Sequence, residues 1–132
     1  MNRKIKLGIN GLGRIGRHIL KLSLKEPNIE VVGINDINPD INNWAYTINY
    51  DTIYGKSQCK FDVNSDCLTV GDKIIRTSNK DIIDQVPWYK WDVDIVLDCT
   101  GVQKNVINSA KIIEENLAKK VIISHSPENV DF

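Results

Sequence analysis

The sequence has no excess of either charge and no long hydrophobic run. Its 132 residues include 17 lysine and arginine residues and 17 aspartate and glutamate residues, so the formal net charge is zero. A balanced charge does not attract nucleic acid or an anionic membrane, and we expect neither as a partner. No apolar stretch is long enough to cross a bilayer, and Met1 to Lys4 lead into a strand-like segment, unlike a signal peptide.

Cysteine is also scarce. The three cysteines, Cys59, Cys67 and Cys99, are an odd number without metal-ligand spacing, which argues against a disulfide framework and a metal site. This usage is typical of a reduced, cytoplasmic protein. A length of 132 residues allows one domain with a true core, which we place at residues 1–132.

The most informative segment is a glycine turn near the amino terminus. An apolar alternation over residues 5–9 predicts a strand, which runs into a G-x-G-x-x-G motif formed by Gly11, Gly13 and Gly16. The first glycine permits a tight turn, the second lets the backbone approach a pyrophosphate, and the third lets a helix pack against the strand. The segment therefore predicts a dinucleotide site, with an ordinary βαβ unit as the alternative.

An acid twenty residues further along supports the dinucleotide interpretation. Asp36 follows a second apolar run over residues 31–35, where a carboxylate can accept both hydroxyls of an adenosine ribose. A carboxylate also repels the extra phosphate of NADP, and Ile37 supplies no compensating cation, so we expect NAD. The alternative role for Asp36 is to cap the helix that begins near Ile41, but Asp40 is better placed for that.

The first turn of the helix after the glycines offers unpaired backbone N–H groups and a partial positive charge. We expect the backbone N–H groups of Arg14 and Ile15 to hold the phosphates. The Arg14 side chain either flanks a phosphate or a neighbouring subunit, or is simply solvated. The apolar residues of this helix predict a buried stripe of Ile15, Ile19, Leu20, Leu22 and Leu24.

The rest of the chain reads as an α/β protein. We expect a helix over residues 41–50 and small antiparallel strands over 59–63, 67–70 and 73–76. We then expect a short helix and loop over 80–91, a strand over 93–98, a helix over 105–116 and a strand over 121–124. The buried stripe of the last helix is predicted as Val106, Ile107, Ala110, Ile113 and Leu117. The predicted fold class is a Rossmann-type doubly wound parallel sheet with a small antiparallel insertion.

In such a sheet, ligands bind beyond the carboxyl ends of the strands. Thr100 and Gly101 therefore face the same crevice as Gly11 and Asp36, and Ser124 and His125 approach it from the last strand. His125 could contact a cofactor or act as a base, but without a visible partner it is better explained as a polar loop residue.

At this point the residues resemble a known family. Residues 8–17 (GINGLGRIGR) are similar to the opening of glyceraldehyde-3-phosphate dehydrogenase, which usually has phenylalanine at Leu12. The likeness continues in order through IND at 34–36, YDT at 50–52 with GK at 55–56, VPW at 86–88, DCTG at 98–101 and VIIS at 121–124. The resemblance implies an NAD-binding domain. It implies Arg14 and Ile15 at the pyrophosphate, Asp36 at the ribose and Lys80 by the adenine, with Thr100, Gly101 and Ser124 along the cofactor groove.

The chain also departs from the family pattern. Gln103 stands where an aromatic residue often packs by the adenine, and Tyr54 replaces a usual histidine. The nucleophilic cysteine, in a Ser-Cys-Thr-Thr-Asn run, and its partner histidine are not found in residues 1–132. Cys99 cannot replace that cysteine, because it lies in the groove motif without a flanking base. We therefore expect no catalytic residue in this chain.

Two hypotheses follow. The chain is the NAD-binding part of a phosphorylating dehydrogenase of glyceraldehyde 3-phosphate, with erythrose 4-phosphate as the subfamily alternative. Otherwise it is a stand-alone nucleotide-binding or regulatory module. In the first case the small phosphorylated aldehyde meets only the full-length enzyme, and the family's homotetramer is the expected assembly.

Overall fold

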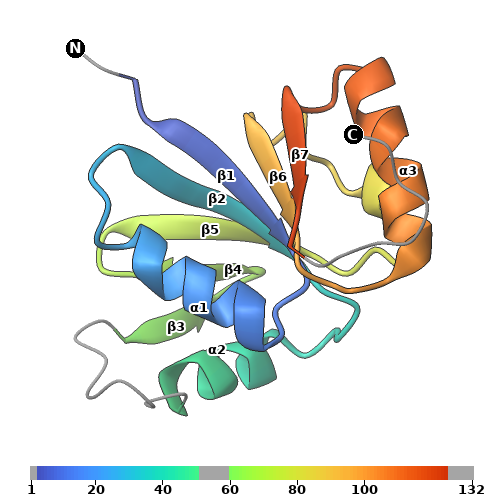
Figure 1. Ribbon diagram of the computed structural model, residues 1–132. Helices are drawn as coiled ribbons and strands as arrows, with labels where there is room; N and C mark the ends of the chain where they lie inside the picture. The colour runs from blue at the N-terminus through green and yellow to red at the C-terminus, as the bar shows by residue number, and fades with distance from the viewer. Residues whose placement is uncertain (1–2, 51–59, 125–132) are drawn as a thin grey trace.

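The computed structural model describes residues 3–50 and 60–124. These residues form one seven-stranded sheet with helices packed on it (Figure 1). The elements in chain order are β1 (Ile5–Asn10), α1 (Arg14–Ser23), β2 (Ile29–Asn35), α2 (Ile41–Tyr50), β3 (Phe61–Asn64), β4 (Cys67–Val70), β5 (Lys73–Ser78), the 3-10 turn η1 (Ile83–Gln85), β6 (Ile95–Asp98), α3 (Gln103–Glu114) and β7 (Lys120–Ile123).

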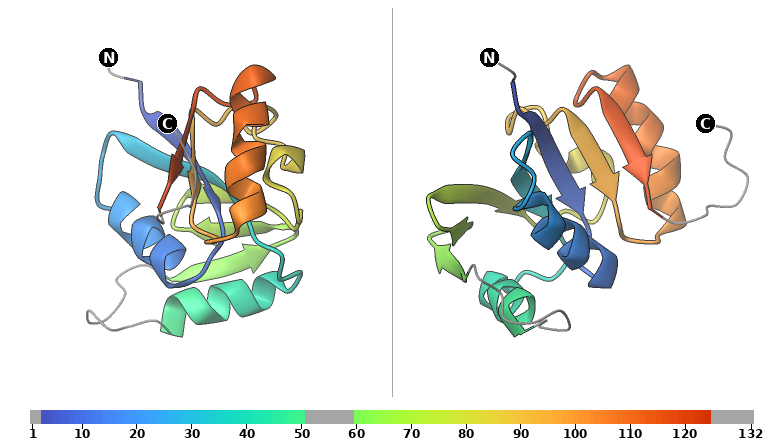
Figure 2. Two further views of the ribbon diagram at one scale, coloured as in Figure 1. Left: turned by 45° about the vertical axis from the view of Figure 1, so that its right-hand side comes forward. Right: turned by 60° about the vertical axis from the view of Figure 1, so that its left-hand side comes forward.

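The strands lie in the order β3-β4-β5-β2-β1-β6-β7. The five strands from β5 to β7 are parallel, with β1 between β2 and β6. Helix α1 covers one face of this parallel sheet and α3 covers the other, as the two views of Figure 2 show. The predicted Rossmann-type fold class is confirmed, and β1 and β2 end side by side at Asn10 and Asn35.

The antiparallel insertion is smaller than predicted. β3 pairs with β4 and β4 pairs with β5 in antiparallel fashion, but β5 also pairs with β2 in parallel. β5 is therefore the third strand of the parallel sheet as well as the last strand of the insertion. The alternation of residues 73–76 does not reveal this double role, because period two is common to both kinds of strand.

Two hydrophobic cores lie on the two faces of the sheet. The core under α1 and α2 includes Ile9, Leu20 and Ile34, all fully buried. The core under α3 and η1 includes Trp88 and Ile112, also fully buried. Successive side chains of a strand point to opposite faces, so β2 supplies Val31 and Ile34 to the first core and packs Val32 against the second.

Two glycines make room for two tryptophan rings on the α3 face. Gly8 of β1 and Gly33 of β2 are partners in the parallel register. A Cβ on Gly8 would lie 2.5 Å from Cζ3 of Trp88, and one on Gly33 would overlap the ring of Trp91. The two indoles meet edge to face, with centroids 5.6 Å apart. A methyl group at either glycine would therefore displace an aromatic ring.

The buried stripes of α1 and α3 differ from those predicted. In α1 the buried residues are Gly16, Leu20 and Ser23, whereas Ile15 and Leu22 are half exposed. The helix is turned this way because Gly16 packs directly on the carbonyl oxygen of Gly11, and residues four and seven further along share its face.

In α3 the buried residues are Asn105, Val106, Ser109 and Ile112, and Ile107 and Ile113 are exposed. Polar side chains occupy this face because they are hydrogen-bonded. Asn105 Oδ1 accepts from the backbone N–H of Ile83 at 3.3 Å, and Ser109 Oγ donates to the carbonyl of Asn105 at 2.6 Å. The predicted stripe was shifted because it counted apolar residues only.

An ion-pair cluster ties the amino end of β1 to the segments before β6 and β7. Asp94 accepts hydrogen bonds from the backbone N–H of Lys6 and from Arg3, both at 2.9 Å, and lies 3.5 Å from the Lys119 ammonium. Burial alone would raise the pKa of Asp94, but the Lys6 hydrogen bond and the two cations outweigh it and lower that pKa.

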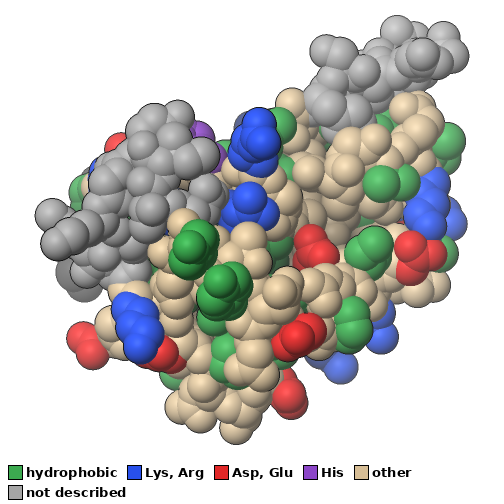
Figure 3. All heavy atoms as spheres, turned by 90° about the horizontal axis from the view of Figure 1, so that it is seen from below, with side chains coloured by type: hydrophobic (Ala, Val, Ile, Leu, Met, Phe, Trp, Pro, Cys, Tyr) green, Lys and Arg blue, Asp and Glu red, His purple; other side chains and the backbone are tan. Residues whose placement is uncertain are grey.

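No helix in the described ranges is long and apolar enough to span a membrane. The face shown in Figure 3 carries acidic and basic side chains interspersed with hydrophobic ones. This mixture agrees with the zero formal net charge of the sequence.

Candidate functional site

The glycine turn joins the carboxyl end of β1 to α1. Gly11 has a φ of +97°, a conformation that only glycine adopts readily. A side chain on Gly16 would collide with the carbonyl oxygen of Gly11, so this glycine sets the close approach of helix and turn. A Cβ on Gly13 would meet nothing within 4 Å. Gly13 is thus the glycine that the fold itself does not require.

The amino end of α1 opens beside Gly13. Gly13 is its N-cap residue, no side chain of the described chain caps it, and its first turn holds no acidic residue. The first N–H groups of a helix have no partner within the helix, so those of Arg14 and Ile15 are available to an anion. A bare helix end and open space at Gly13 are the features that a pyrophosphate needs.

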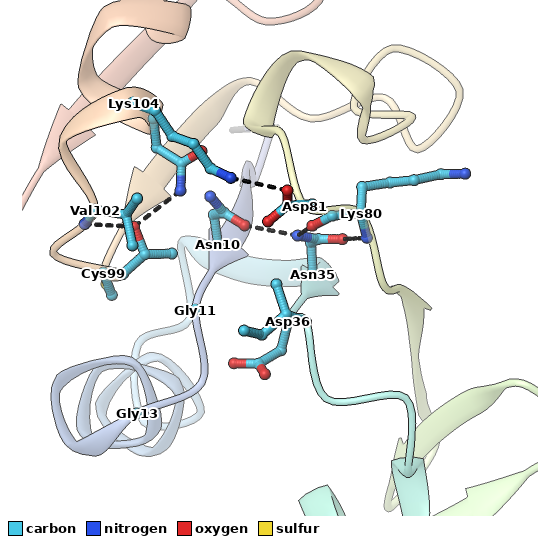
Figure 4. Close-up of a pocket in the computed structure, with 13 residues that line it drawn as sticks. Asn10, Gly11, Gly13, Asn35, Asp36, Lys80, Asp81, Cys99, Val102 and Lys104 are labelled. Carbon is cyan, nitrogen blue, oxygen red and sulfur yellow. Dashed lines mark hydrogen bonds and ion pairs between the residues drawn. The ribbon is translucent and has the colours of Figure 1, made fainter.

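Asp36 bridges the two loops that follow β1 and β2. Its Oδ2 accepts a hydrogen bond from the backbone N–H of Leu12 at 2.6 Å, and its Oδ1 accepts from the N–H of Asn38 at 3.0 Å. Figure 4 shows the carboxylate pointing toward the glycine turn. Asp40 caps α2, because its Oδ1 accepts from the N–H of Asn43 at 3.2 Å. The prediction that Asp40 and not Asp36 is the cap is confirmed.

A cleft of about 380 Å³ lies at the carboxyl ends of β1, β2 and β6. It brings together five of the predicted site residues, Gly11, Gly13, Asp36, Lys80 and Thr100. Further residues line it that the sequence did not single out as site residues: Asn10, Asn35, Ile37, Asp81, Cys99, Val102, Lys104 and Asn105. The position is the one where open α/β sheets bind ligands.

Two buried asparagines form the floor of the cleft. Asn35 Nδ2 donates to Asn10 Oδ1 at 2.8 Å and to the carbonyl of Lys80 at 2.9 Å. Asn35 Oδ1 accepts from the N–H of Lys80 at 2.7 Å and from Ser78 Oγ at 2.6 Å. These contacts hold the segment after β5 against the end of β2. Both asparagines stand at the end of an apolar strand, and this position was the sequence feature that could have identified them as residues of the cleft.

Lys80 lies at the cleft, but mainly through its backbone. Figure 4 shows its side chain running away from Asn35 and Asp36. The cation that reaches across the cleft is Lys104, in the first turn of α3, whose Nζ lies 2.8 Å from Asp81 Oδ2. Gln103, its neighbour, does not line the cleft.

The turn after β6 is organised by Asp98, which is fully buried. Its Oδ1 accepts from the N–H and the hydroxyl of Thr100, at 3.2 and 2.8 Å. Asn105 Nδ2 donates to the Thr100 hydroxyl at 3.0 Å, which ties the turn to α3. Gly101 lies in the same turn with a φ of +70° and does not itself line the cleft.

Ser124 does not line the cleft and is linked to it through Asp98. Its backbone N–H and its hydroxyl both donate to the carbonyl of Asp98 at 3.0 Å. Next to it, burial raises the pKa of the Cys99 thiol, against the hydrogen bond with Ser124. A thiol with a raised pKa is a poor nucleophile. His125, Cys59, residues 51–52 of the YDT motif and the GK motif lie outside the described residues.

Two tryptophans bond backbone carbonyls in the segments that follow cleft residues Asp36 and Asp81. Trp44 of α2 donates from Nε1 to the carbonyl of Asn38 at 2.8 Å, beside Asp36. Trp88 donates from Nε1 to the carbonyl of Ile83 at 2.9 Å, two residues after Asp81. No group of three or more potential metal ligands occurs within residues 3–50 and 60–124.

A parallel sheet with this strand order, a glycine turn into an uncapped helix and an acid at the end of β2 define a dinucleotide-binding Rossmann domain. Residues 5–106 match the sequence model described as the NAD-binding domain of glyceraldehyde 3-phosphate dehydrogenase. The chain belongs to this family. Its cofactor is NAD, and the uncapped helix and the open space at Gly13 suit that cofactor.

Curated relatives carry the same family name. The chain is 39% identical over 127 residues to glyceraldehyde-3-phosphate dehydrogenase of Geobacillus stearothermophilus and 40% identical over 127 residues to that of Priestia megaterium. Each match covers 96% of this chain and 37% of the relative. Glyceraldehyde-3-phosphate dehydrogenase 1 of Giardia intestinalis is 38% identical over 120 residues, covering 91% of this chain and 35% of the relative. The chain thus spans little more than a third of the length of these relatives.

Proposed function

We propose that residues 1–132 form one NAD-binding domain that serves a phosphorylating glyceraldehyde-3-phosphate dehydrogenase. The family match over residues 5–106 is the observation that carries this proposal. In the whole protein, a small phosphorylated aldehyde is oxidised with NAD and phosphate. NAD supplies the hydride chemistry when bound, and this chain supplies binding and orientation.

We assign the pyrophosphate of NAD to the bare N–H groups of Arg14 and Ile15, next to Gly13. The carboxylate of Asp36 receives the adenosine ribose, because it lies at the cleft and its oxygens retain free lone pairs beyond the two backbone hydrogen bonds. The remaining residues of this proposed site are Gly11, Lys80 and Thr100, which line the cleft, and Gly16, Gly101 and Ser124, which lie behind the lining residues and support them.

We further propose that these 132 residues bind NAD without turning over substrate. Cys99 is the only cysteine that lines the described cleft, and its pKa is raised by burial, opposite to the activation that a nucleophile needs. The cysteine and histidine of the reaction belong to sequence outside residues 1–132. The whole protein is proposed to act in the cytoplasm as the family's homotetramer.

Titration calorimetry with NAD, with NADP as comparator, tests the proposal. We expect NAD to bind and NADP to bind at least tenfold more weakly, because the 2′-phosphate would face the Asp36 carboxylate. In parallel, ¹⁵N-labelled chain should show NAD-dependent shifts of the amide resonances of residues 11–16 and 36. Unmoved resonances at millimolar NAD would reject the site.

A further inference from the structure

The loop that carries Asp36 is held by a residue from the neighbouring strand. β5 lies beside β2 in the sheet, and the two strands end together, because Asn35 and Ser78 are register partners (Figure 1). Asn79 follows β5 directly, just as Asp36 follows β2. The backbone N–H of Asp36 donates to the carbonyl of Ser78 at 3.2 Å, so the loop leaves β2 alongside Asn79.

The Asn79 side chain uses both of its donors on this loop. Its Nδ2 donates to the carbonyl of Asp36 at 3.1 Å and to the carbonyl of Asn38 at 3.0 Å. An asparagine amide carries two N–H donors on one nitrogen, and here each has a carbonyl acceptor. Trp44 Nε1 bonds the same Asn38 carbonyl at 2.8 Å from the side of α2. Both ends of the segment 36–38 are therefore tied to the residue after β5, and its far end also to α2.

This hold bears on the direction of the Asp36 carboxylate. Its Oδ1 accepts from the N–H of Asn38 at 3.0 Å, a contact that closes the segment 36–38 into an Asx turn. The carboxylate accepts this bond and the bond from the N–H of Leu12 together only while the loop keeps its shape. A residue that fixes the two carbonyls of the turn thereby fixes where the carboxylate points.

The carboxylate has a second space within reach. Besides the cofactor cleft, a hollow of about 240 Å³ lies beside α2, lined among others by Asn38, Trp44 and Thr47. Asp36 is the one described residue that lines both spaces. A carboxylate released from the turn can rotate into this second hollow, where it would no longer meet a ribose in the cleft.

We propose that Asn79 is a positioning residue for the adenosine ribose, which acts through Asp36 and sets the preference for NAD over NADP. Asn79 does not line the cleft, so its effect passes through the loop. With Asn79 in place, the carboxylate is held toward the ribose hydroxyls and against a 2′-phosphate. Without it, NAD loses a pre-oriented acceptor and NADP loses an obstacle. This inference rests on the proposed function.

Calorimetry with NAD and NADP on the variant Asn79→Ala tests the role. We expect NAD to bind about three- to tenfold more weakly than to the unmodified chain, the loss expected when one or two exposed hydrogen bonds are removed. The affinity for NADP should fall less than about twofold, so the ratio of the two affinities falls. The urea midpoint should stay near that of the unmodified chain, because Asn79 is exposed.

Two further variants bracket this result. Asn79→Ser keeps one donor on a shorter side chain, so its NAD affinity and its ratio should fall between those of Asn79→Ala and the unmodified chain. It can replace Asn79→Ala in the comparison if the latter does not fold. The matched control, Asn64→Ala, removes an exposed asparagine at the end of β3 and should change neither affinity.

A double-mutant cycle separates an effect through Asp36 from a direct one. When Asn79→Ala is added to Asp36→Ala, NAD should weaken less than about twofold further, because the carboxylate that Asn79 positions is gone. A residue that supports the fold in general would weaken NAD by the same factor in both backgrounds.

Unchanged NAD affinity in Asn79→Ala would overturn the positioning role. Equal losses for NAD and NADP would also overturn it, as would a further loss of about threefold or more in the Asp36→Ala background. Failure of the unmodified chain to bind NAD would instead overturn the proposed function, and this inference with it.

Discussion

The backbone N–H of Leu12 donates a 2.6 Å hydrogen bond to the carboxylate of Asp36. Asp36, which is proposed to bind the ribose, therefore also holds the glycine turn in position. A ligand that bonds this carboxylate bonds a group whose position is already fixed by the turn. Pre-organisation of this kind reduces the ordering cost of binding.

Replacement of Asp36 should remove both roles. Asp36→Ala is expected to weaken NAD binding by about 10- to 100-fold, because hydrogen bonds to charged groups contribute roughly 1.5–3 kcal/mol. Asp36→Asn keeps one acceptor oxygen and should weaken NAD less. Calorimetry would measure both. As a control, Asp40→Asn preserves the cap of α2 and should bind NAD as the unmodified chain does. If Asp36→Ala bound NAD with unchanged affinity, the assignment of Asp36 to the ribose would be wrong.

The glycines of the turn should separate folding from binding. Gly16→Ala would place a methyl group against the carbonyl of Gly11 and should lower the free energy of unfolding by about 2 kcal/mol or more. Gly13→Ala meets open space, so its stability should change by less than about 1 kcal/mol while NAD binding weakens at least tenfold. Urea unfolding and calorimetry on both variants are the measurements. A Gly13→Ala chain that binds NAD normally would contradict the placement of the pyrophosphate.

The packing of Trp88 against Gly8 predicts a stability effect far from the cofactor. Gly8→Ala puts a methyl group 2.5 Å from the Trp88 ring and should cost about 1–3 kcal/mol of unfolding free energy. Gly71→Ala is a useful contrast, because a Cβ there meets nothing within 4 Å, although its φ of +57° carries a strain of about 1 kcal/mol. If Gly8→Ala were as stable as the unmodified chain in urea, the packing of Trp88 on β1 would be wrong.

Acid should loosen the amino end of β1. The pKa of Asp94 is lower in the folded chain than its ordinary value of 3.8, so its contribution is full above that value and is lost as pH falls through the folded pKa. Asp94→Asn should lower the unfolding free energy by about 1–2 kcal/mol at pH 7 and by less below pH 4. Urea midpoints at both pH values test this. Asp92→Asn removes only an exposed ion pair with Lys6, so it should change the dependence of the urea midpoint on pH less than Asp94→Asn does. If the urea midpoints of the unmodified chain and of Asp94→Asn changed with pH in parallel, the prediction would be refuted.

The main architecture was predictable because glycine spacing and strand periodicity are local signals. β1, the start of α1 and β4 lie where the sequence placed them, and Asp36 reaches the cleft with Gly11 and Gly13. These features depend on backbone geometry that a few neighbouring residues determine.

The features that the sequence did not predict depend on contacts between segments that are far apart in the sequence. Asn105 and Ser109 are buried because of hydrogen bonds that hydrophobicity does not encode, so the face of α3 was assigned wrongly. The importance of Lys104 is visible only once Asp81, 23 residues earlier, is brought opposite it. Lys80 was expected beside the adenine, and its backbone, which the sequence did not single out, makes the hydrogen bonds to Asn35.

The indole hydrogen bonds of Trp44 and Trp88 give the protein an intrinsic optical reporter. Each ring is bonded to the carbonyl of a residue two positions after a cleft residue: Asn38 after Asp36, and Ile83 after Asp81. A ligand that displaces either segment would alter the polarity around a fluorophore that is almost wholly shielded from water. We therefore expect cofactor binding to change the ultraviolet emission of the unlabelled chain, and the emission of Trp44→Phe and Trp88→Phe would tell which segment moves.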